Sequence, residues 1–448
     1  MSHAVYWFTH DLRVEDNKGF AQAMASESAL MCVYCLSPEV LTPKRYHQSQ
    51  MGKARLLFLL QSLQELDDEL KKMGQHLHVI IARPESLMTS LHANYDIRRI
   101  YHSMQAGWNE AKQFKRFSSL PSAYLYEFSN HTLFKANDLP FEIAQLPPSF
   151  SQFRRAIEKN EILISPPSTA PRSGAAPLVN QQENWFEHLC QRFDLPLTLE
   201  QKDINQYGFK GGCISGLTHL EDYFDSIAPQ TYKATRNALD GWSSSSKLSP
   251  WLAVGGISPR QVIRGLQSHE AYWGKNDSTY WIFFELLWRE YFQWYAIKHG
   301  SKLFAFEGIT EQKPLNSFYP ERFTRWCQGD TPYPIVNACM KQLNETGFMS
   351  NRGRQIVASC FVHELQLDWR YGAAYFEQHL LDYDVAANWG NWQYLAGVGA
   401  DPRGWRRFDL AKQTALYDPD GKFIATWASL PPTSQAIDSV DLVDWPVG

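Results

Sequence analysis

The chain contains 448 residues with a mass of 51.7 kDa, a length that indicates two to four domains and a core large enough to fold without disulfides. Hydrophobic residues make up 44% and charged residues 20%, which excludes an intrinsically disordered or fibrous protein. Because 43 Lys and Arg stand against 47 Asp and Glu, the net charge of −4 argues against a globally basic nucleic-acid-binding protein and leaves only a local basic patch open.

The composition also predicts the cellular compartment of the protein. Its seven cysteines, an odd number scattered along the chain, do not suggest a disulfide framework. The first residues include acidic side chains and no long apolar segment, unlike a secretory signal. No run approaches the roughly 18–20 apolar residues of a membrane-spanning helix. We therefore expect a cytoplasmic protein without membrane contacts, and a monomer.

The first 130 residues alternate short apolar runs with helical patterns. Strands are expected over residues 5–8, 29–35, 77–82, 99–102 and 123–127. Between the second and third, leucines recur at helical spacing over residues 52–72. This alternation predicts a doubly wound α/β domain with a five-stranded parallel sheet, whose usual pocket lies beyond the carboxyl ends of the strands.

The second half of the chain has a different pattern. A connector rich in Pro, Ser and Ala covers residues 165–178, and from about residue 200 helical periodicity with many aromatic side chains replaces the strand signals. Helices are expected over 281–299 and 355–369, and turns and a tail from residue 419 onward. The second half is therefore predicted to be all-α.

Several local motifs favour ordinary structural roles. Cys32 and Cys35 form a CxxC on an expected strand, where positions i and i+3 point to opposite faces, so two core cysteines are favoured over a redox or zinc pair. The sequence has no Walker A loop and no HExxH motif, and the acidic residues near position 384 do not have EF-hand spacing. No metal site is expected.

Three other segments are suited to binding. The serine run at 243–249 precedes a helix, where hydroxyls and free N–H groups can cradle a phosphate, although such a run is equally often a loop or cap. Glu285 and Arg289 lie four residues apart in an aromatic helix and can pair on one face. Acidic and arginine side chains within the apolar stretches 347–355 and 381–394 indicate a polar pocket with compensated charge.

Five sequence blocks, taken together and in order, resemble the photolyase/cryptochrome family, and within it the cryptochrome DASH branch. They read YKATRN, SSKLSPWL, ELLWRE, TGFMSNRGRQ and DYDVAANWGNWQY, and the similarity extends over nearly the whole chain. The resemblance implies a photolyase-type α/β domain at 1–132, an interdomain linker at 133–200, a helical FAD-binding catalytic domain at 201–420 and a C-terminal tail at 421–448.

The resemblance also implies a flavin site, with FAD in a U-shaped conformation. Arg354 pairs with Asp382 beside the isoalloxazine, and Asn388 faces flavin N5, where an amide offers a donor and an acceptor without fixed charge. The cofactor-binding residues that it implies are Tyr232, Ser245, Ser246, Lys247, Leu248, Ser249, Arg289, Asn351, Arg354, Asp382, Asp384 and Asn388.

Catalytic roles follow from the same resemblance for Trp392, Trp369, Asn388 and Glu285. The two tryptophans match the inner members of an electron-transfer chain, although core packing is the default role of a tryptophan. Asn316 stands where the outer member is expected, so the third step passes through Tyr319 or another tryptophan, or is absent.

The implied substrate is a pyrimidine dimer in DNA, flipped into a pocket above the flavin. The matching residues are Glu285, Trp288, Asn351, Arg352, Gln355 and Tyr394. Tyr394 and Gln355 are DASH-like and make this pocket more polar, which favours a dimer in single-stranded DNA, with RNA as a further candidate partner. Phosphate contacts are proposed for Arg236, Arg403, Arg406, Arg407 and Lys412, each of which can equally be a solvated surface residue.

A methenyltetrahydrofolate antenna is the second implied cofactor. In DASH members a glutamate after the fourth strand binds the pterin, and Gln105 is the nearest match in this sequence.

The sequence thus predicts a light-driven lyase that repairs cyclobutane pyrimidine dimers by electron transfer from photoexcited reduced FAD. The alternative is a blue-light photoreceptor without repair activity. A dark FAD oxidoreductase is disfavoured because no nicotinamide-binding fingerprint is present.

Overall fold

The computed structural model describes residues 3–42, 49–172, 174–180, 184–197, 208–310, 312–400 and 407–428. Its N-terminal part is built on a parallel sheet with strand order β3-β2-β1-β4-β5. The strands are β1 (His3–Phe8), β2 (Ala29–Leu36), β3 (Leu77–Ile81), β4 (Ile97–Ser103) and β5 (Tyr124–Phe128). A two-residue strand, β6 (Ala176–Pro177), pairs with the start of β2. The predicted five-stranded parallel sheet is confirmed, with β6 as an addition.

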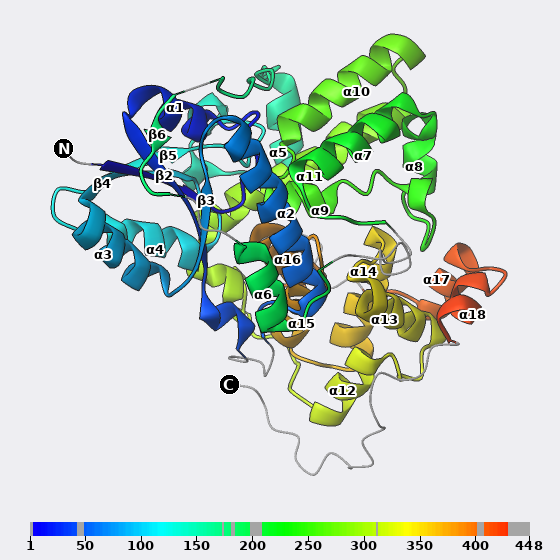
Figure 1. Cartoon of the computed structure of the whole chain (residues 1–448). Helices are drawn as coiled ribbons and strands as arrows, with labels where there is room; N and C mark the ends of the chain where they lie inside the picture. The colour runs from blue at the N-terminus through cyan, green and yellow to red at the C-terminus, as the bar shows by residue number, and fades with distance from the viewer. Residues whose placement is uncertain are drawn as a thin grey trace.

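Helices cover both faces of this sheet, as the doubly wound prediction required (Figure 1). The first helices are α1 (Lys18–Ser26), α2 (Lys53–Lys72), α3 (Pro84–Tyr95) and α4 (Trp108–Phe117). Phe20 of α1 and Leu60 of α2 pack with Tyr6 on one face, whereas Leu91 of α3 packs with Trp7 on the other. Alternate residues of β1 therefore supply two separate cores.

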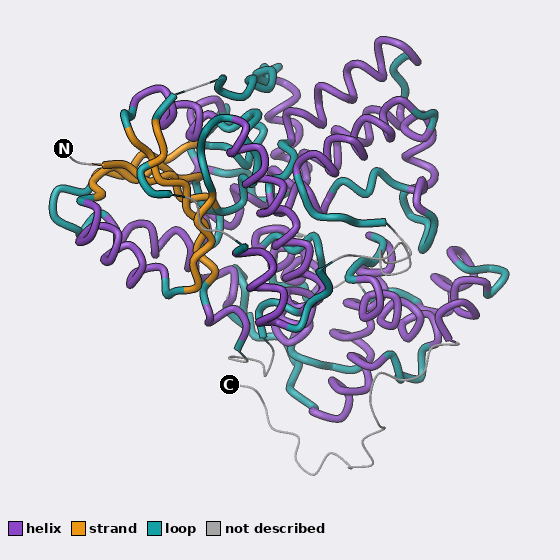
Figure 2. Tube along the Cα trace, viewed as in Figure 1, coloured by secondary structure: helices purple, strands orange, loops and turns teal. Residues whose placement is uncertain are grey.

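The rest of the described chain is mainly helical (Figure 2), and most of its buried apolar side chains form one continuous hydrophobic cluster. Helix α5 (Phe150–Lys159) packs into this cluster, whereas α6 (Trp185–Phe193) packs with the sheet. The others are α7 (Cys213–Asp225), α8 (Tyr232–Thr235), α9 (Ser249–Val254), α10 (Pro259–Trp273), α11 (Asp277–His299), α12 (Pro320–Gln328), α13 (Pro334–Thr346), α14 (Asn351–Ser359), α15 (Trp369–His379), α16 (Val385–Leu395), α17 (Leu410–Tyr417) and α18 (Lys422–Ala428).

The long aromatic helix α11 begins earlier than the periodicity indicated. The Asn276 side chain accepts hydrogen bonds from the backbone amides of Ser278 and Thr279, and the Thr279 hydroxyl accepts one from the backbone amide of Asn276. This capping box fixes the start of the helix at Asp277 rather than at residue 281.

The single helix expected over 355–369 is wrong, because two helices share this stretch. Helix α14 ends at Ser359 and continues as a π-helical turn, Cys360–Glu364. Gln366 then takes a left-handed φ of 56°, and Asp368 caps the start of α15 by accepting from the Arg370 amide. The break places Trp369 in the first turn of a new helix.

The expectation of turns and a tail from residue 419 is also corrected. The Asp418 carboxylate accepts hydrogen bonds from the Phe423 and Ile424 amides, which caps α18. Phe423 and Trp427 are buried, and α18 packs against α13. The turn motif at 418–421 thus begins a packed helix, and residues 429–448 lie outside the described chain.

The cysteines and hydropathy follow the expected pattern. Cys32 packs in one sheet core and Cys35 against the other, so the CxxC pair lies on opposite faces as predicted. All seven cysteines are free thiols. Within the described ranges, no helix combines the length and the apolar character that crossing a membrane requires.

Candidate active site

A cavity of about 540 Å³ lies in the helical half, a size within the roughly 300–1,000 Å³ of cofactor and ligand pockets. The sequence-predicted residues that line it are Tyr232, Ser245, Ser246, Lys247, Leu248, Ser249, Glu285, Trp288, Arg289, Asn351, Arg352, Arg354, Gln355, Asp382, Asp384 and Tyr394. Residues from α8, α9, α11, α14 and α16 thus meet at one site, although they are far apart in the sequence.

The serine-rich segment before α9 forms a polar part of the wall. Lys247 takes a left-handed φ of 53°, a strained conformation for a residue with a side chain. Its ammonium lies 5.1 Å from the centre of the Phe348 ring, and burial lowers its pKa to about 8. His219 donates to the Ser246 carbonyl at 2.8 Å, which fixes the loop. A buried cation beside hydroxyls at a helix start is suited to a phosphate.

Arg354 and Asp382 form the predicted ion pair. Arg354 Nη2 donates to Asp382 Oδ2 at 2.8 Å, and its Nε donates to the Met349 carbonyl at 2.9 Å. The Asp382 side chain is 3% exposed, and its Oδ1 is a buried oxygen that has no hydrogen-bond partner in the described chain. Because buried polar atoms are normally satisfied, this oxygen on the cavity wall fits a hydrogen-bond donor on a ligand.

Asp384 is positioned by the start of α16. Its Oδ1 accepts from the Ala387 amide at 2.9 Å, which caps the helix, and its Oδ2 accepts from Gln293 Nε2 at 2.7 Å. Arg289 Nη2 lies 3.9 Å from Oδ2. Burial raises the pKa of Asp384, but the Arg289 cation and the hydrogen bond from the Ala387 amide hold that pKa well below its usual range, so the carboxylate is ionised.

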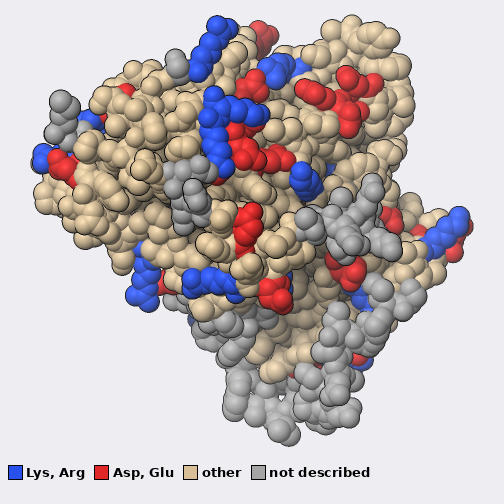
Figure 3. Space-filling view, viewed as in Figure 1, with Lys and Arg blue, Asp and Glu red and all other residues tan. Residues whose placement is uncertain are grey.

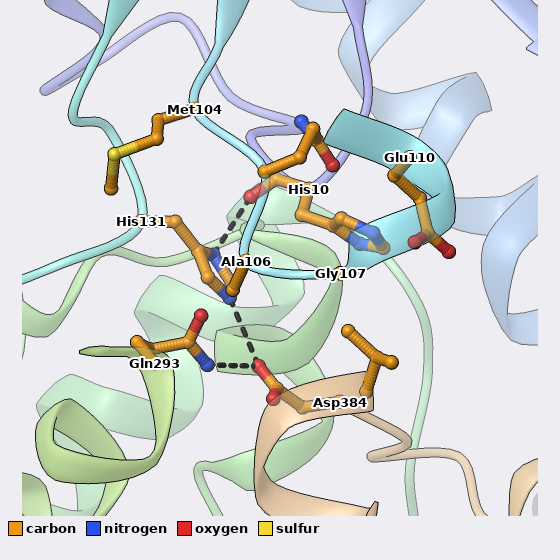
Figure 4. Close-up of a pocket in the computed structure, with 10 residues that line it drawn as sticks. His10, Met104, Ala106, Gly107, Glu110, His131, Gln293 and Asp384 are labelled. Carbon is orange, nitrogen blue, oxygen red and sulfur yellow. Dashed lines mark hydrogen bonds and ion pairs between the residues drawn. The ribbon is translucent and has the colours of Figure 1, made fainter. Parts of the chain in front are cut away.

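His131 joins this carboxylate to the α/β domain (Figure 4). Its Nδ1 donates to the His10 carbonyl at 3.0 Å, and its Nε2 lies 3.1 Å from Asp384 Oδ2 and within hydrogen-bonding distance of Arg289. Burial and the Arg289 charge lower the pKa of His131 to about 3, so the imidazole is neutral. No motif in the sequence pointed to His131, since only its place in the fold brings it to Asp384.

Glu285 and Arg289 do not form the pair expected from their spacing. The Glu285 carboxylate is 2.6 Å from Arg236 Nη1, whereas Arg289 turns toward Asp384. Each side chain has a closer partner of opposite charge on another element, so the contact along α11 is not made. Burial raises the pKa of Glu285 despite the nearby Arg236 cation.

Aromatic side chains line another part of the cavity. Trp288 stacks on Phe150 with ring centres 3.8 Å apart and meets Tyr394 edge-on at 6.0 Å. The Arg352 guanidinium lies 4.8 Å from the Tyr417 ring, and its Nη2 donates to Asn237 at 3.3 Å. This region combines flat surfaces for stacking with polar groups at its edges.

Three predicted residues are not among those that line the cavity. Asn388 is buried, and its Nδ2 donates to the Ala373 carbonyl at 2.9 Å. Trp369 is also buried and donates to the Phe306 carbonyl at 3.1 Å. Trp392 is 2% exposed within the helical core. The structure leaves their proposed redox roles untested.

The predicted antenna residue, Gln105, lies just after β4. Gln105 Nε2 donates to Thr9 and to the Ser103 carbonyl, so its amide is used within the fold. The glutamate that follows β4 is Glu110, in the first turn of α4, and its Oε2 is buried without a partner in the described chain. Both residues line a cavity of about 20 Å³, room for about one water and not for a pterin, so we derive no step through a folate.

The proposed phosphate contacts separate into three groups. Arg236 is 17% exposed and belongs to the cavity wall. Arg407 is exposed and pairs with Glu364 at 2.8 Å, and Lys412 is an exposed residue of α17. Arg403 and Arg406 lie outside the described residues. On the face seen in Figure 3, Lys and Arg side chains alternate with Asp and Glu rather than forming one basic surface.

Sequence reasoning also missed apolar members of the cavity. Phe348 lies under both Lys247 and Arg354, and Phe292 and Leu252 complete the wall. Phe348 falls within the TGFMSNRGRQ block, so the block itself was the only signal that could have marked it.

Comparisons with known proteins match most of the chain. The family model for the FAD binding domain of DNA photolyase matches residues 281–437, and the model for DNA photolyase matches residues 4–172. A cryptochrome DASH of Idiomarina loihiensis is 49% identical over 99% of this chain and 96% of its own. A cryptochrome DASH of Vibrio parahaemolyticus is 46% identical over 99% and 97%.

Solved structures show the same architecture. The crystal structure of a cryptochrome from Synechocystis has a TM-score of 0.87 and 36% identity, over 95% of this chain and 88% of its own. A bacterial class III photolyase from Agrobacterium tumefaciens has a TM-score of 0.80 and 25% identity, over 95% and 86%.

Proposed function

This chain belongs to the cryptochrome DASH branch of the photolyase and cryptochrome family and has its FAD-binding domain, and from that premise we propose that it repairs cyclobutane pyrimidine dimers in single-stranded DNA under blue light. The observation that carries the proposal is the composite 540 Å³ cavity, which joins a cationic, hydroxyl-rich wall to an aromatic wall with a half-buried glutamate.

The residues present fit FAD. Lys247 and the serines around it suit the pyrophosphate, and the unpartnered Asp382 oxygen suits a donor on the flavin ring. The Asp382 and Asp384 carboxylates are balanced by Arg354 and Arg289, so the ring region carries no uncompensated negative charge. Reduced FAD, when bound, supplies the photoexcited electron for repair, and the protein supplies orientation and electrostatics.

The aromatic part of the cavity suits the dimer. Trp288 and Tyr394 offer ring surfaces for the two bases, and Glu285 offers a hydrogen bond to a base carbonyl when it is protonated, a state that burial favours. Arg352 and Gln355 lie on the same wall and suit the DNA backbone or base edges.

A preference for single strands follows from the cost of extraction. Flipping bases out of a duplex costs a few kcal/mol of stacking and pairing, which a single strand mostly avoids. A pocket with one Trp and one Tyr, in a protein of net charge −4, offsets little of that cost.

The test is repair of dimers in irradiated oligo(dT), as a single strand and in a duplex with oligo(dA), under blue light with reduced FAD. We expect rapid loss of dimers from the single strand and little from the duplex. Glu285→Ala should lower the repair rate about tenfold, because it removes the hydrogen-bond donor to the base carbonyl, and one hydrogen bond to a charged or strongly polarised group contributes roughly 1.5 kcal/mol.

Glu158→Ala is the control, because Glu158 pairs with Tyr280 and Arg154 outside the cavity and its loss should leave repair unchanged. If dimers persist in the single strand while the bound flavin is still reduced by light, repair is excluded and a light receptor becomes the function.

A further inference from the structure

The helical core contains a second aromatic path that leads away from Trp369. The position expected to hold an outer tryptophan is Asn316, whose Nδ2 donates to the Val362 carbonyl at 2.7 Å. An amide that is used to hold the backbone cannot supply an electron. An electron donor, if the chain has one, must therefore lie elsewhere.

Trp389 is the ring that meets Trp369. Their ring centres are 5.8 Å apart at an interplanar angle of 77°, an edge-to-face contact between α15 and α16. Trp389 also lies three residues before Trp392, one turn earlier on α16. The interface of α15 and α16 thus places a third tryptophan against Trp369 and one turn along α16 from Trp392.

Trp389 in turn contacts a phenol and a carboxylate. Its Nε1 donates to Tyr383 Oη at 3.3 Å and to Glu377 Oε2 at 3.2 Å. Trp369 is 1% and Trp389 4% exposed, whereas Tyr383 is half-buried. Tyr383 is therefore the most exposed ring of this path.

Glu377 is placed to take the proton of Tyr383. The two side chains are hydrogen-bonded to each other, and burial raises the pKa of Glu377 to about 7. The charged groups that face the pair are Arg55 of α2, whose guanidinium lies 4.3 Å from the Tyr383 ring, and Glu110 of α4. The pKa of Glu377 is close enough to neutrality for it to accept a proton and release it again.

We propose that Trp389 and Tyr383 are the outer electron donors of this protein, and that Tyr383 transfers its phenolic proton to Glu377 as it is oxidised. This inference rests on the proposed flavin site and on the expected tryptophan chain, in which Trp392 would give one electron to light-excited oxidised FAD. Trp369 then reduces the oxidised Trp392, Trp389 reduces the oxidised Trp369, and Tyr383 reduces the oxidised Trp389.

The products balance. The Tyr383 O–H bond breaks, the electron goes to the Trp389 radical cation, and the proton goes to the Glu377 carboxylate. A neutral tyrosyl radical remains, and a thiol in solution restores it by giving back one hydrogen atom. Proton transfer to Glu377 prevents the formation of a buried phenol cation, which would be far more costly.

The experiment is time-resolved electron paramagnetic resonance of the FAD-loaded protein, oxidised, illuminated and without DNA. We expect a tyrosyl radical whose spectrum narrows when tyrosine is ring-deuterated. Tyr383→Phe should abolish that signal, and Trp389→Phe should prevent its formation. Tyr371→Phe is the matched control, a neighbouring half-buried tyrosine that stacks on Phe318, and should leave the signal intact.

The proton acceptor is tested separately. Glu377→Gln should delay the radical, and in the unchanged protein the radical yield should fall as the pH drops through about 7, because a protonated Glu377 cannot accept. A tyrosyl signal that persists in Tyr383→Phe, or that disappears in Tyr371→Phe, overturns the proposal. Because no DNA is present, the result does not depend on whether the protein repairs dimers.

Discussion

Several charged side chains of the cavity pair with specific partners that the tertiary fold brings close, rather than with the residue four positions away on the same helix. Glu285 and Arg289 could have paired with each other four residues apart, yet each pairs with a residue of another element. Sequence alone shows that a helix can make such a pair, but only the tertiary fold decides which partner is nearer.

Asp382 is the residue on which the cavity depends most. Asp382→Asn keeps the shape but leaves Arg354 without its buried counter-charge, and breaking a buried pair costs about 3–5 kcal/mol. We expect the variant to be purified with little flavin. The ratio of flavin to protein absorbance after gel filtration measures this.

Asp368→Asn is the matched control for that prediction. Asp368 is fully buried and pairs with Arg370 at 2.6 Å, but it does not line the cavity. The Asp368→Asn variant should have a lower thermal stability and should retain its flavin. Equal flavin content in the two variants would contradict the role given to Asp382.

At the scale of elements, helices α15 and α16 approach closely because of a glycine. A Cβ on Gly372 would lie 2.2 Å from the Trp392 ring, so a side chain cannot be added without moving that ring. We expect Gly372→Ala to destabilise the protein by about 1–3 kcal/mol, as overpacking a core does. Denaturant unfolding measures the loss, and near-ultraviolet circular dichroism reports the displaced tryptophan.

Gly256→Ala serves as its control, since a Cβ there would meet its nearest atom at an ordinary 3.4 Å. If both substitutions have the same effect on unfolding, the close approach at Gly372 does not explain it.

The elements that could be predicted from the sequence are those with a clear pattern of hydrophobic residues. The five strands were expected within two residues of their observed starts and ends, because buried parallel strands are continuous apolar runs. The break at residues 360–368 and helix α18 were missed, since they depend on one left-handed residue, Gln366, and on a cap from Asp418. Local hydrogen bonds of this kind leave no trace in the hydrophobic pattern.

The site shows the same division. Sixteen of the residues that the family blocks marked do line the cavity. His131 and Glu110, which come from the α/β side and line the smaller cavity, were not marked by any block. Their importance arises where two distant parts of the chain meet, which periodicity cannot report.

At the scale of the whole molecule, a buried ion pair joins the α/β and helical parts. Arg260 of α10 donates from Nε to Asp16 Oδ2 at 2.9 Å and from Nη1 to the Thr132 carbonyl at 3.0 Å. The Asp16 side chain is fully buried, and its Oδ1 accepts from the Ser168 amide at 3.0 Å in the connector. One carboxylate thus ties the sheet, the connector and a helix of the flavin-binding half together.

Asp16→Asn should therefore weaken the whole molecule and not one element. Leaving Arg260 buried without its counter-charge should cost about 3–5 kcal/mol of unfolding free energy. Because the lost contact lies between the two parts, their unfolding should become less cooperative, seen as separate transitions of the sheet and of the aromatic helices during denaturant unfolding. Asp194→Asn removes the exposed pair between Lys53 and Asp194 and should leave the single transition unchanged. The Asp16→Asn variant could instead unfold in one equally steep transition, with the stability of the unchanged protein. That result would show that the two parts are held together by their apolar contacts alone.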